Sequence, residues 1–315
     1  LTAVVHYKQF WAPWVTQFAL GILPRHGTGD PSQMGSWEWN RTANPTNGPF
    51  VLEEWQAADH MTFVRNEYWH EEGKPYLDRI LYPITTELEV QRQMLKTGEN
   101  DMHHWLTDDY VDEVKSWPNV TVKEGPSPYW FRVQFNLTDQ GNLNKPHPIL
   151  GDVRVRRALA HAIDRQLIID RIQYGLAQPT YSAFTPTCWC YNPDVPHRDF
   201  DLAKARELLD QAGWRPGADG IRVKDGQRLQ LRLLYGPNTN KVREKIATIV
   251  QDSFRQIGVQ VEITGLEWAA YLSALKSPPY TNWDLNVGGW QATIDPHWMY
   301  QIWSEDNIPD LNAGA

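Results

Sequence analysis

Apolar and polar residues follow a regular α/β pattern in the second half of the chain. Alternating apolar and polar residues predict strands, and apolar residues three or four apart predict helices. By these rules we expect helices at 201–213, 240–257, 267–275 and 297–304, and strands at 229–235, 259–264 and from residue 283 onward. Strand–helix–strand units of this size indicate a parallel or mixed sheet with helices on its faces. Ligands of such sheets bind beyond the strand ends.

The first half of the chain is less regular. Its alternating segments predict strands at 1–10, 50–55, 61–65, 79–84, 101–106, 120–124 and 129–137. Its helical patterns predict a helix at 15–23, a second between the capping residues Thr86 and Gly98, and one long helix that Asp152 caps and that reaches Ile168.

Two segments without a regular pattern have separate interpretations. Residues 25–49 predict a long loop that contains Trp37 and Trp39, which either pack within the loop or form a binding lip. Residues 177–200 are rich in Pro, Tyr and Thr, and we interpret them as a hinge between two domains.

The stretch 283–296 (WDLNVGGWQATIDP) has an unusual composition for a strand end. Paired glycines let a backbone bend or approach another group closely. Trp290 follows them directly, and Pro296 suits the start of the next helix. The stretch therefore fits either a bulged strand end with a core tryptophan or an aromatic residue presented to a ligand.

Composition and charge exclude several classes of protein. The chain has 315 residues, enough for two domains, and a net charge of −8 with no basic run, which argues against nucleic-acid binding. No apolar stretch approaches the roughly 18 residues of a membrane span. The 16 tryptophans suggest stacking of flat or sugar-like ligands, although an aromatic-rich core is the alternative. The chain begins in mid-strand and ends without a closing element, so we expect it to be part of a longer protein.

Catalytic, cofactor and metal motifs are missing from the sequence. We find no nucleophile elbow, phosphate-binding loop, zinc-protease or dinucleotide-binding motif, so we predict a protein that is not an enzyme and needs no cofactor. His103 and His104 are adjacent in a predicted strand and point to opposite faces, which argues against joint metal binding. Cys188 and Cys190 lack further zinc ligands at suitable spacing. Both cysteines are free, or one pairs with a cysteine outside this chain.

Five motifs, taken in order, resemble solute-binding protein family 5, the dipeptide- and oligopeptide-binding components of bacterial ABC transporters. They are NGPFVLEEW at 47–55, VRNEYW at 64–69 with GKPYLD at 73–78, LKTGEND at 95–101, DVRVRRAL at 152–159 and AIDR at 162–165. Each motif alone is modest, but their number and order make chance an inadequate explanation. The resemblance covers essentially the whole chain.

The resemblance implies an α/β, two-lobed class II periplasmic-binding-protein fold that is incomplete at both ends of this chain. Residues 1–182 would be part of lobe I, and residues 183–315 would be lobe II. The whole protein would be periplasmic or extracellular, tethered as a lipoprotein through a signal region outside this chain. A membrane ABC permease complex would be its partner, and the protein itself would be a monomer.

The resemblance also implies a cleft around Gly289 and Trp290. Family members carry an aspartate three residues after this tryptophan, which pairs with the free α-amine of a peptide. Here Thr293 takes that position, and Asp295 could replace the acid only if the turn is rearranged. Some members carry a cysteine where this chain has Gln291. The predicted ligand-binding residues are Trp290, Gly289, Gln291, Thr293, Asp295, Asn136, Tyr129, Trp130, Trp105 and Phe184.

These observations predict a solute-binding protein that captures an oligosaccharide or a peptide between two lobes and delivers it to an ABC importer. The tryptophan content and Thr293 favour a neutral oligosaccharide, and the family as a whole favours a peptide. A sensor or chemoreceptor-type module on the same fold is the alternative.

Overall fold

The structure, a computed structural model, describes residues 4–8, 23–104, 106–139, 141–236, 241–276, 282–293 and 295–304. The chain forms two compact units. Unit 1 contains residues 1–105 and 117–120, and unit 2 contains residues 106–116 and 121–315. Among the described residues, the helices are all too short or too polar to cross a lipid bilayer.

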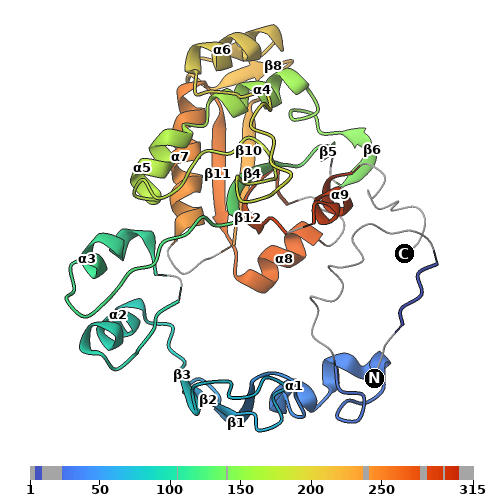
Figure 1. Ribbon diagram of the computed structural model, residues 1–315. Helices are drawn as coiled ribbons and strands as arrows, with labels where there is room; N and C mark the ends of the chain where they lie inside the picture. Colours follow the sequence, from blue (N-terminus) through green and yellow to red (C-terminus); the bar gives the residue numbers. More distant parts are fainter. Residues whose placement is uncertain are drawn as a thin grey trace. The chain divides into compact units, whose positions relative to one another are not determined.

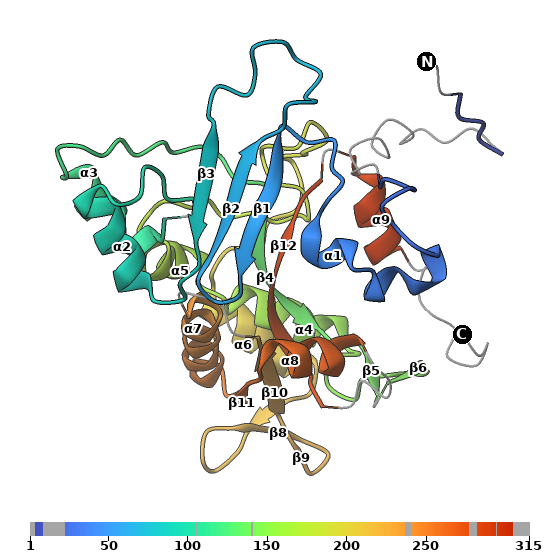
Figure 2. The same cartoon turned by 90° about the horizontal axis from the view of Figure 1, so that it is seen from below.

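Unit 1 is built on a three-stranded antiparallel sheet, visible in Figure 2. Its strands are β1 (Phe50–Gln56), β2 (His60–Arg65) and β3 (Arg79–Pro83), and neighbours in sequence are neighbours in the sheet. The helix α2 (Leu88–Thr97) ends at Gly98, whose φ of 77° is the left-handed conformation that favours glycine. The predicted loop 25–49 contains two short helices, η2 (Pro31–Ser36) and α1 (Trp39–Thr42).

Three predicted strands of the first half are wrong where the structure describes them. Residues 4–8, the described part of 101–106 and residues 120–124 form no strand. These segments have residues that suit a strand, but a strand needs a neighbour to complete its hydrogen bonds and side-chain pairs. The predicted helix at 15–23 lies largely outside the described residues.

Unit 2 is organised around a four-stranded sheet with the order β11-β10-β12-β4, seen in the upper half of Figure 1. The strands are β4 (Tyr129–Phe135), β10 (Gln230–Tyr235), β11 (Gln260–Gly265) and β12 (Leu285–Gln291). β10 is parallel to β11 and β12, whereas β4 is antiparallel to β12. The predicted mixed sheet is therefore confirmed.

Two crossover helices connect the parallel strands and cover opposite faces of the sheet. α7 (Val242–Gln256) joins β10 to β11, and α8 (Trp268–Lys276) returns across β10 to β12. On one face, Phe254 of α7 belongs to the same buried core as Leu285 and Val287. On the other face, Tyr271 of α8 donates a hydrogen bond to Asn286. The strands that follow β10 thus lie on its two sides, β11 on one and β12 on the other. This arrangement makes the carboxyl ends of β10 and β12 a topological switch point.

The predicted long helix after Asp152 is two helices, α4 (Val153–His161) and α5 (Arg165–Ile172). The helix is interrupted before Asp164, because the Asp164 carboxylate accepts a hydrogen bond from the Leu167 N–H and caps a new helix, α5. α6 (Leu202–Gln211) follows, and Asp201 caps it as predicted.

Short elements complete unit 2. They are η3 (Asp108–Tyr110), α3 (Val111–Lys115), β5 (Thr138–Asp139), β6 (Asn142–Pro146), β7 (Arg215–Pro216), β8 (Arg222–Lys224), β9 (Gln227–Arg228) and α9 (His297–Trp303). The small hairpin strands were not predicted, because a segment of two or three residues is too short for a period to show. The lobe boundary at 182 stays a prediction; β4 before it pairs with β12 after it.

Candidate ligand-binding site

The antiparallel pairing of β4 with β12 brings five of the predicted binding residues together. The register places Tyr129 opposite Gln291, Trp130 opposite Trp290, and Phe131 opposite Gly289. This group lies at the carboxyl end of β12, beside the carboxyl end of its parallel neighbour β10. It is the sheet edge at which α/β proteins bind ligands.

The two glycines of β12 each make room for a neighbouring side chain. A Cβ atom on Gly289 would lie 2.5 Å from Cζ of Tyr129, so any larger residue would displace that ring. A Cβ on Gly288 would lie 3.2 Å from Asn286 Nδ2 and 3.7 Å from Arg132 Cζ. The glycine pair therefore permits close approach of side chains to the strand.

Arg132 is the charged residue at the centre of this group. It lies on the same face of β4 as Trp130, because residues two apart in a strand share a face. Its guanidinium carbon is 5.1 Å from the ring centre of Trp130 and 5.4 Å from those of Trp290 and Trp303. These distances suit cation–π attraction. Its Nε and Nη2 atoms donate to Gln134 Oε1 at 3.3 and 3.1 Å.

Arg132 is partly buried and has a second arginine nearby. Burial lowers the pKa of its guanidinium, and Tyr271 and Tyr129 act in the opposite direction. Arg243, at the start of α7, adds a second positive charge nearby. Arg243 is buried and donates hydrogen bonds to the carbonyl oxygen of Gly236 and the hydroxyl of Tyr129, at 3.4 and 3.3 Å.

Exposed aromatic side chains lie on α8 and α9, and two of them contact residues beside the group. Trp268, Trp298, Tyr300 and Trp303 are all between 46% and 51% exposed, which is unusual for such large rings. Trp303 contacts Arg132, and Trp268 stacks on Tyr271 with 5.5 Å between ring centres. Such surfaces commonly mark a place where another molecule binds.

The turn after β12 uses its polar side chains internally. The Thr293 hydroxyl donates to the carbonyl oxygen of Asp295 at 2.7 Å. The Asp295 carboxylate accepts from the His297 N–H at 2.8 Å, at the start of α9. Asp295 is also close enough to contribute to the raised pKa of Cys190. Cys188 and Cys190 are both free, with their sulfur atoms 2.8 Å apart.

The three remaining predicted binding residues come from other segments of the chain. Asn136 follows the opposite end of β4, roughly 20 Å away by strand length, and its side-chain amide donates to the Trp283 carbonyl oxygen at 3.1 Å. Phe184 lies in the 177–200 connector, where its backbone bonds to the side chain of Ser182. Trp105 lies outside the described residues.

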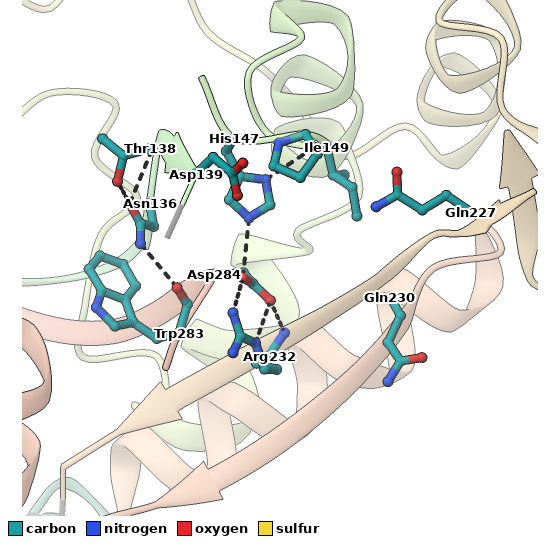
Figure 3. A pocket seen from close by; sticks show the side chains of 11 residues that line it. Asn136, Thr138, Asp139, His147, Ile149, Gln227, Gln230, Arg232, Trp283 and Asp284 are labelled. Atoms are coloured by element: carbon teal, nitrogen blue, oxygen red, sulfur yellow. Dashed lines mark hydrogen bonds and ion pairs between the residues drawn. The ribbon is translucent and has the colours of Figure 1, made fainter. Parts of the chain in front are cut away.

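The far end of the β4–β12 pair borders a cavity of about 240 Å³, shown in Figure 3. There the Asp284 carboxylate accepts hydrogen bonds from the Arg232 backbone N–H at 2.7 Å and from its guanidinium at 2.8 and 3.1 Å. His147 Nε2 lies 3.1 Å from Asp284, while His147 Nδ1 accepts from two backbone N–H groups. Nε2 therefore carries the hydrogen and donates a hydrogen bond to the Asp284 carboxylate.

Sequence reasoning missed Arg132, Arg243, Tyr271 and Asn286 as members of the site. Arg132 had a signal, because a lone charge inside the aromatic strand YWFRVQF must find a partner when the strand is half-buried. The other three come from separate elements, and no local pattern connects them. Among the described residues, no cluster of three His, Cys, Asp or Glu side chains is placed to hold a metal ion.

Residues 5–309 match the family described as bacterial extracellular solute-binding proteins, family 5 Middle. The oligopeptide-binding protein AppA of Bacillus subtilis is 28% identical over 91% of this chain and 51% of its own length. The nickel-binding periplasmic protein of Escherichia coli is 28% identical over 79% of this chain and 46% of its own length.

Solved structures agree with the sequence comparisons. The structure of Bacillus subtilis AppA in complex with a nonapeptide superimposes with a TM-score of 0.68 at 27% identity, over 91% of this chain and 55% of that one. The chain therefore has the class II periplasmic-binding fold that the resemblance predicted. It spans about half the length of the curated relatives it matches.

Proposed function

Because the chain belongs to the bacterial extracellular solute-binding proteins of family 5, we propose that the protein binds a small peptide and delivers it to a membrane ABC importer. The observation that carries this proposal is the gathering of Tyr129, Trp130, Gly289, Trp290 and Gln291 at the carboxyl ends of β10 and β12. This group offers aromatic faces and a cation without any arrangement that suggests catalysis.

A peptide is preferred over the oligosaccharide that the tryptophan content favours. The relatives described above are named for binding oligopeptides or nickel. The charge at the site supports the same choice, because Arg243 is close enough to Arg132 to lower the pKa of its guanidinium, and Arg132 contacts Trp130 and Trp290. A neutral sugar would leave such charges without a counter-charge.

The remaining parts of the proposal concern the whole protein. We expect it to act in the periplasm or outside the cell, as the family description indicates, and to dock on a permease complex in the membrane. A lipid anchor, a monomeric state and the alternative role as a sensor stay predictions. Because the chain spans about half the length of the curated relatives, residues outside it are expected to line part of the cleft.

A thermal-shift screen of the full-length protein tests the ligand class. Di- and tripeptides, α- and β-linked oligosaccharides and a nickel–histidine complex are compared at equal concentration. A ligand that binds only the folded state at 100 times its Kd stabilises that state by about 2.7 kcal/mol. We expect peptides to raise the unfolding temperature. Stabilisation by sugars or nickel–histidine, with none by peptides, would contradict the proposal.

A further inference from the structure

We infer that Arg132 and Asn286 bind a carboxylate group of the ligand in a niche above Gly288, an inference that rests on the proposed peptide-binding function. A peptide can supply this carboxylate from its C-terminus or from an acidic side chain.

The niche is defined by the side chain that Gly288 lacks. The position of a Cβ atom on Gly288 is 3.2 Å from Asn286 Nδ2, 3.5 Å from the Tyr271 hydroxyl oxygen and 3.7 Å from Arg132 Cζ. Three groups that can donate hydrogen bonds thus border one point on β12. Tyr271 already donates to Asn286 Oδ1 at 2.7 Å, which fixes the Asn286 amide with its Nδ2 toward the niche.

Two of these donors lack an acceptor. Arg132 Nη1 and Asn286 Nδ2 are both buried and have no hydrogen-bond partner in the described part of the chain. Leaving a buried donor unsatisfied costs about 1–3 kcal/mol, and more when the group is charged. A carboxylate has two oxygen atoms that can accept from both donors, and arginine binds such groups in a fixed planar geometry.

The surrounding charges favour an anion. The ionisable groups that act on Arg132 are Tyr271, Tyr129 and Arg243, so the described neighbours provide a second cation and no carboxylate. Gln134 supplies a neutral oxygen, and the tryptophans supply only the faces of their rings.

The tryptophan rings act as the cover of the niche. Trp303 is the last residue of α9, is 46% exposed, and lies over the Arg132 guanidinium. Because Trp303 is exposed and the buried core contains Leu285 and Val287 on the other face of the sheet, we expect rotation of this ring to give a ligand access to Arg132. A bound carboxylate is then shielded from water, which strengthens its interaction with the guanidinium.

The test measures the affinities of four peptides for the full-length protein by calorimetry. Trialanine is compared with trialanine amide, and Ala-Glu-Ala amide with Ala-Gln-Ala amide, so the first pair reports a C-terminal carboxylate and the second a side-chain carboxylate. We expect at least one pair to show a preference of about tenfold for the carboxylate. Arg132→Gln should reduce that preference to less than about threefold.

Two further variants separate binding from folding. Gly288→Ala fills the niche and should reduce the same preference with Arg132 still present. Arg255→Gln removes an exposed cation from α7 and should change nothing. If Arg132→Gln does not fold, the wild-type peptide pairs and Gly288→Ala decide the question.

The outcomes that overturn the inference are distinct from failure of the proposed function. Peptides that bind with no carboxylate preference, or with a preference that survives Arg132→Gln and Gly288→Ala, overturn the carboxylate site alone. An equal loss of affinity for all four peptides in Arg132→Gln assigns that arginine a structural role and overturns it as well. If none of the four peptides binds, the peptide function fails, and the carboxylate site fails with it.

Discussion

At the amino end of β12, the Asp284 carboxylate is enclosed by hydrogen bonds from Arg232 and His147. At the carboxyl end of the same strand, the Arg132 guanidinium contacts Trp130 and Trp290 and meets no carboxylate among the described residues. Both ends bury charge on the same pair of strands. At the first end, which we call the closed end, Arg232 and His147 face the Asp284 carboxylate. At the second, which we call the open end, a carboxylate facing Arg132 would have to come from outside the described residues.

This difference explains why the cavity in Figure 3 is not the preferred ligand site. Its charged atoms already form hydrogen bonds with one another, so a ligand would have to replace good interactions. The unsatisfied donors at the Arg132 end are a guanidinium and an amide, Arg132 Nη1 and Asn286 Nδ2, whereas the unsatisfied donor beside the cavity is the neutral indole N–H of Trp283. Buried polar groups are usually satisfied within a protein, so those that are not are the better guide to function.

The largest expected effect comes from removing the counter-charge at the closed end. Asp284→Asn removes the negative charge that faces Arg232 and replaces one of the two acceptor oxygens by an NH2 donor, and it should lower the free energy of unfolding by about 3 kcal/mol. Arg232 is partly exposed, which keeps the effect from being larger. Urea denaturation measures it. Asp219→Asn, which disrupts the exposed pair with Arg228, is the control and should leave the midpoint nearly unchanged. An unchanged midpoint for Asp284→Asn would contradict the structural role.

The next largest effect is expected at the open end. Trp290→Ala removes a half-buried ring beside Arg132 and should lower ligand affinity by at least about tenfold while the protein remains folded. Calorimetry measures the affinity, and circular dichroism checks the fold. Phe200→Ala removes an exposed aromatic ring from the connector and serves as the control. Equal affinities for the two variants would remove Trp290 from the site.

Acid should affect the closed end in a defined direction. Burial alone raises the pKa of Asp284, but hydrogen bonds from His147 and Arg232 outweigh it and hold the pKa well below its usual range. The unfolded chain therefore binds a proton first, near pH 4. Stability from this group is complete above that pH and is lost as the pH falls below it. Denaturation midpoints from pH 7 to pH 3 should fall less steeply in Asp284→Asn than in wild type; parallel curves would contradict this.

The smallest effect concerns Cys190, next to the turn that carries Asp295. Burial, with contributions from Cys188 and Asp295, raises the pKa of the Cys190 thiol to about 11. Alkylation by iodoacetamide requires the thiolate, so it should be slow at pH 8 and accelerate only as the pH approaches 11. Mass spectrometry follows the modification, with a free cysteine peptide as the reference. Rapid modification at pH 8 would show that this segment is more open than in the structure.

Local sequence determined most of the secondary structure, because the signals are contained in a few neighbouring residues. The apolar positions of α7 and the alternation in β10 and β12 are examples. The caps at Asp152 and Asp201 form the hydrogen bonds that their side chains predict. The five sequence motifs were enough to identify the family, because a motif depends only on the order of residues along the chain.

Tertiary structure decided which of these residues form a site. The pairing of β4 with β12 joins segments about 150 residues apart and sets Trp130 opposite Trp290, but it also sends Asn136 to the other end. No pattern in the sequence connects Arg132 with Asn286, because they come from different strands and meet only above the glycine between them. The sequence by itself therefore determined the elements and the family. The position of Arg132, which meets no carboxylate among the described residues, followed from the register of one strand pair.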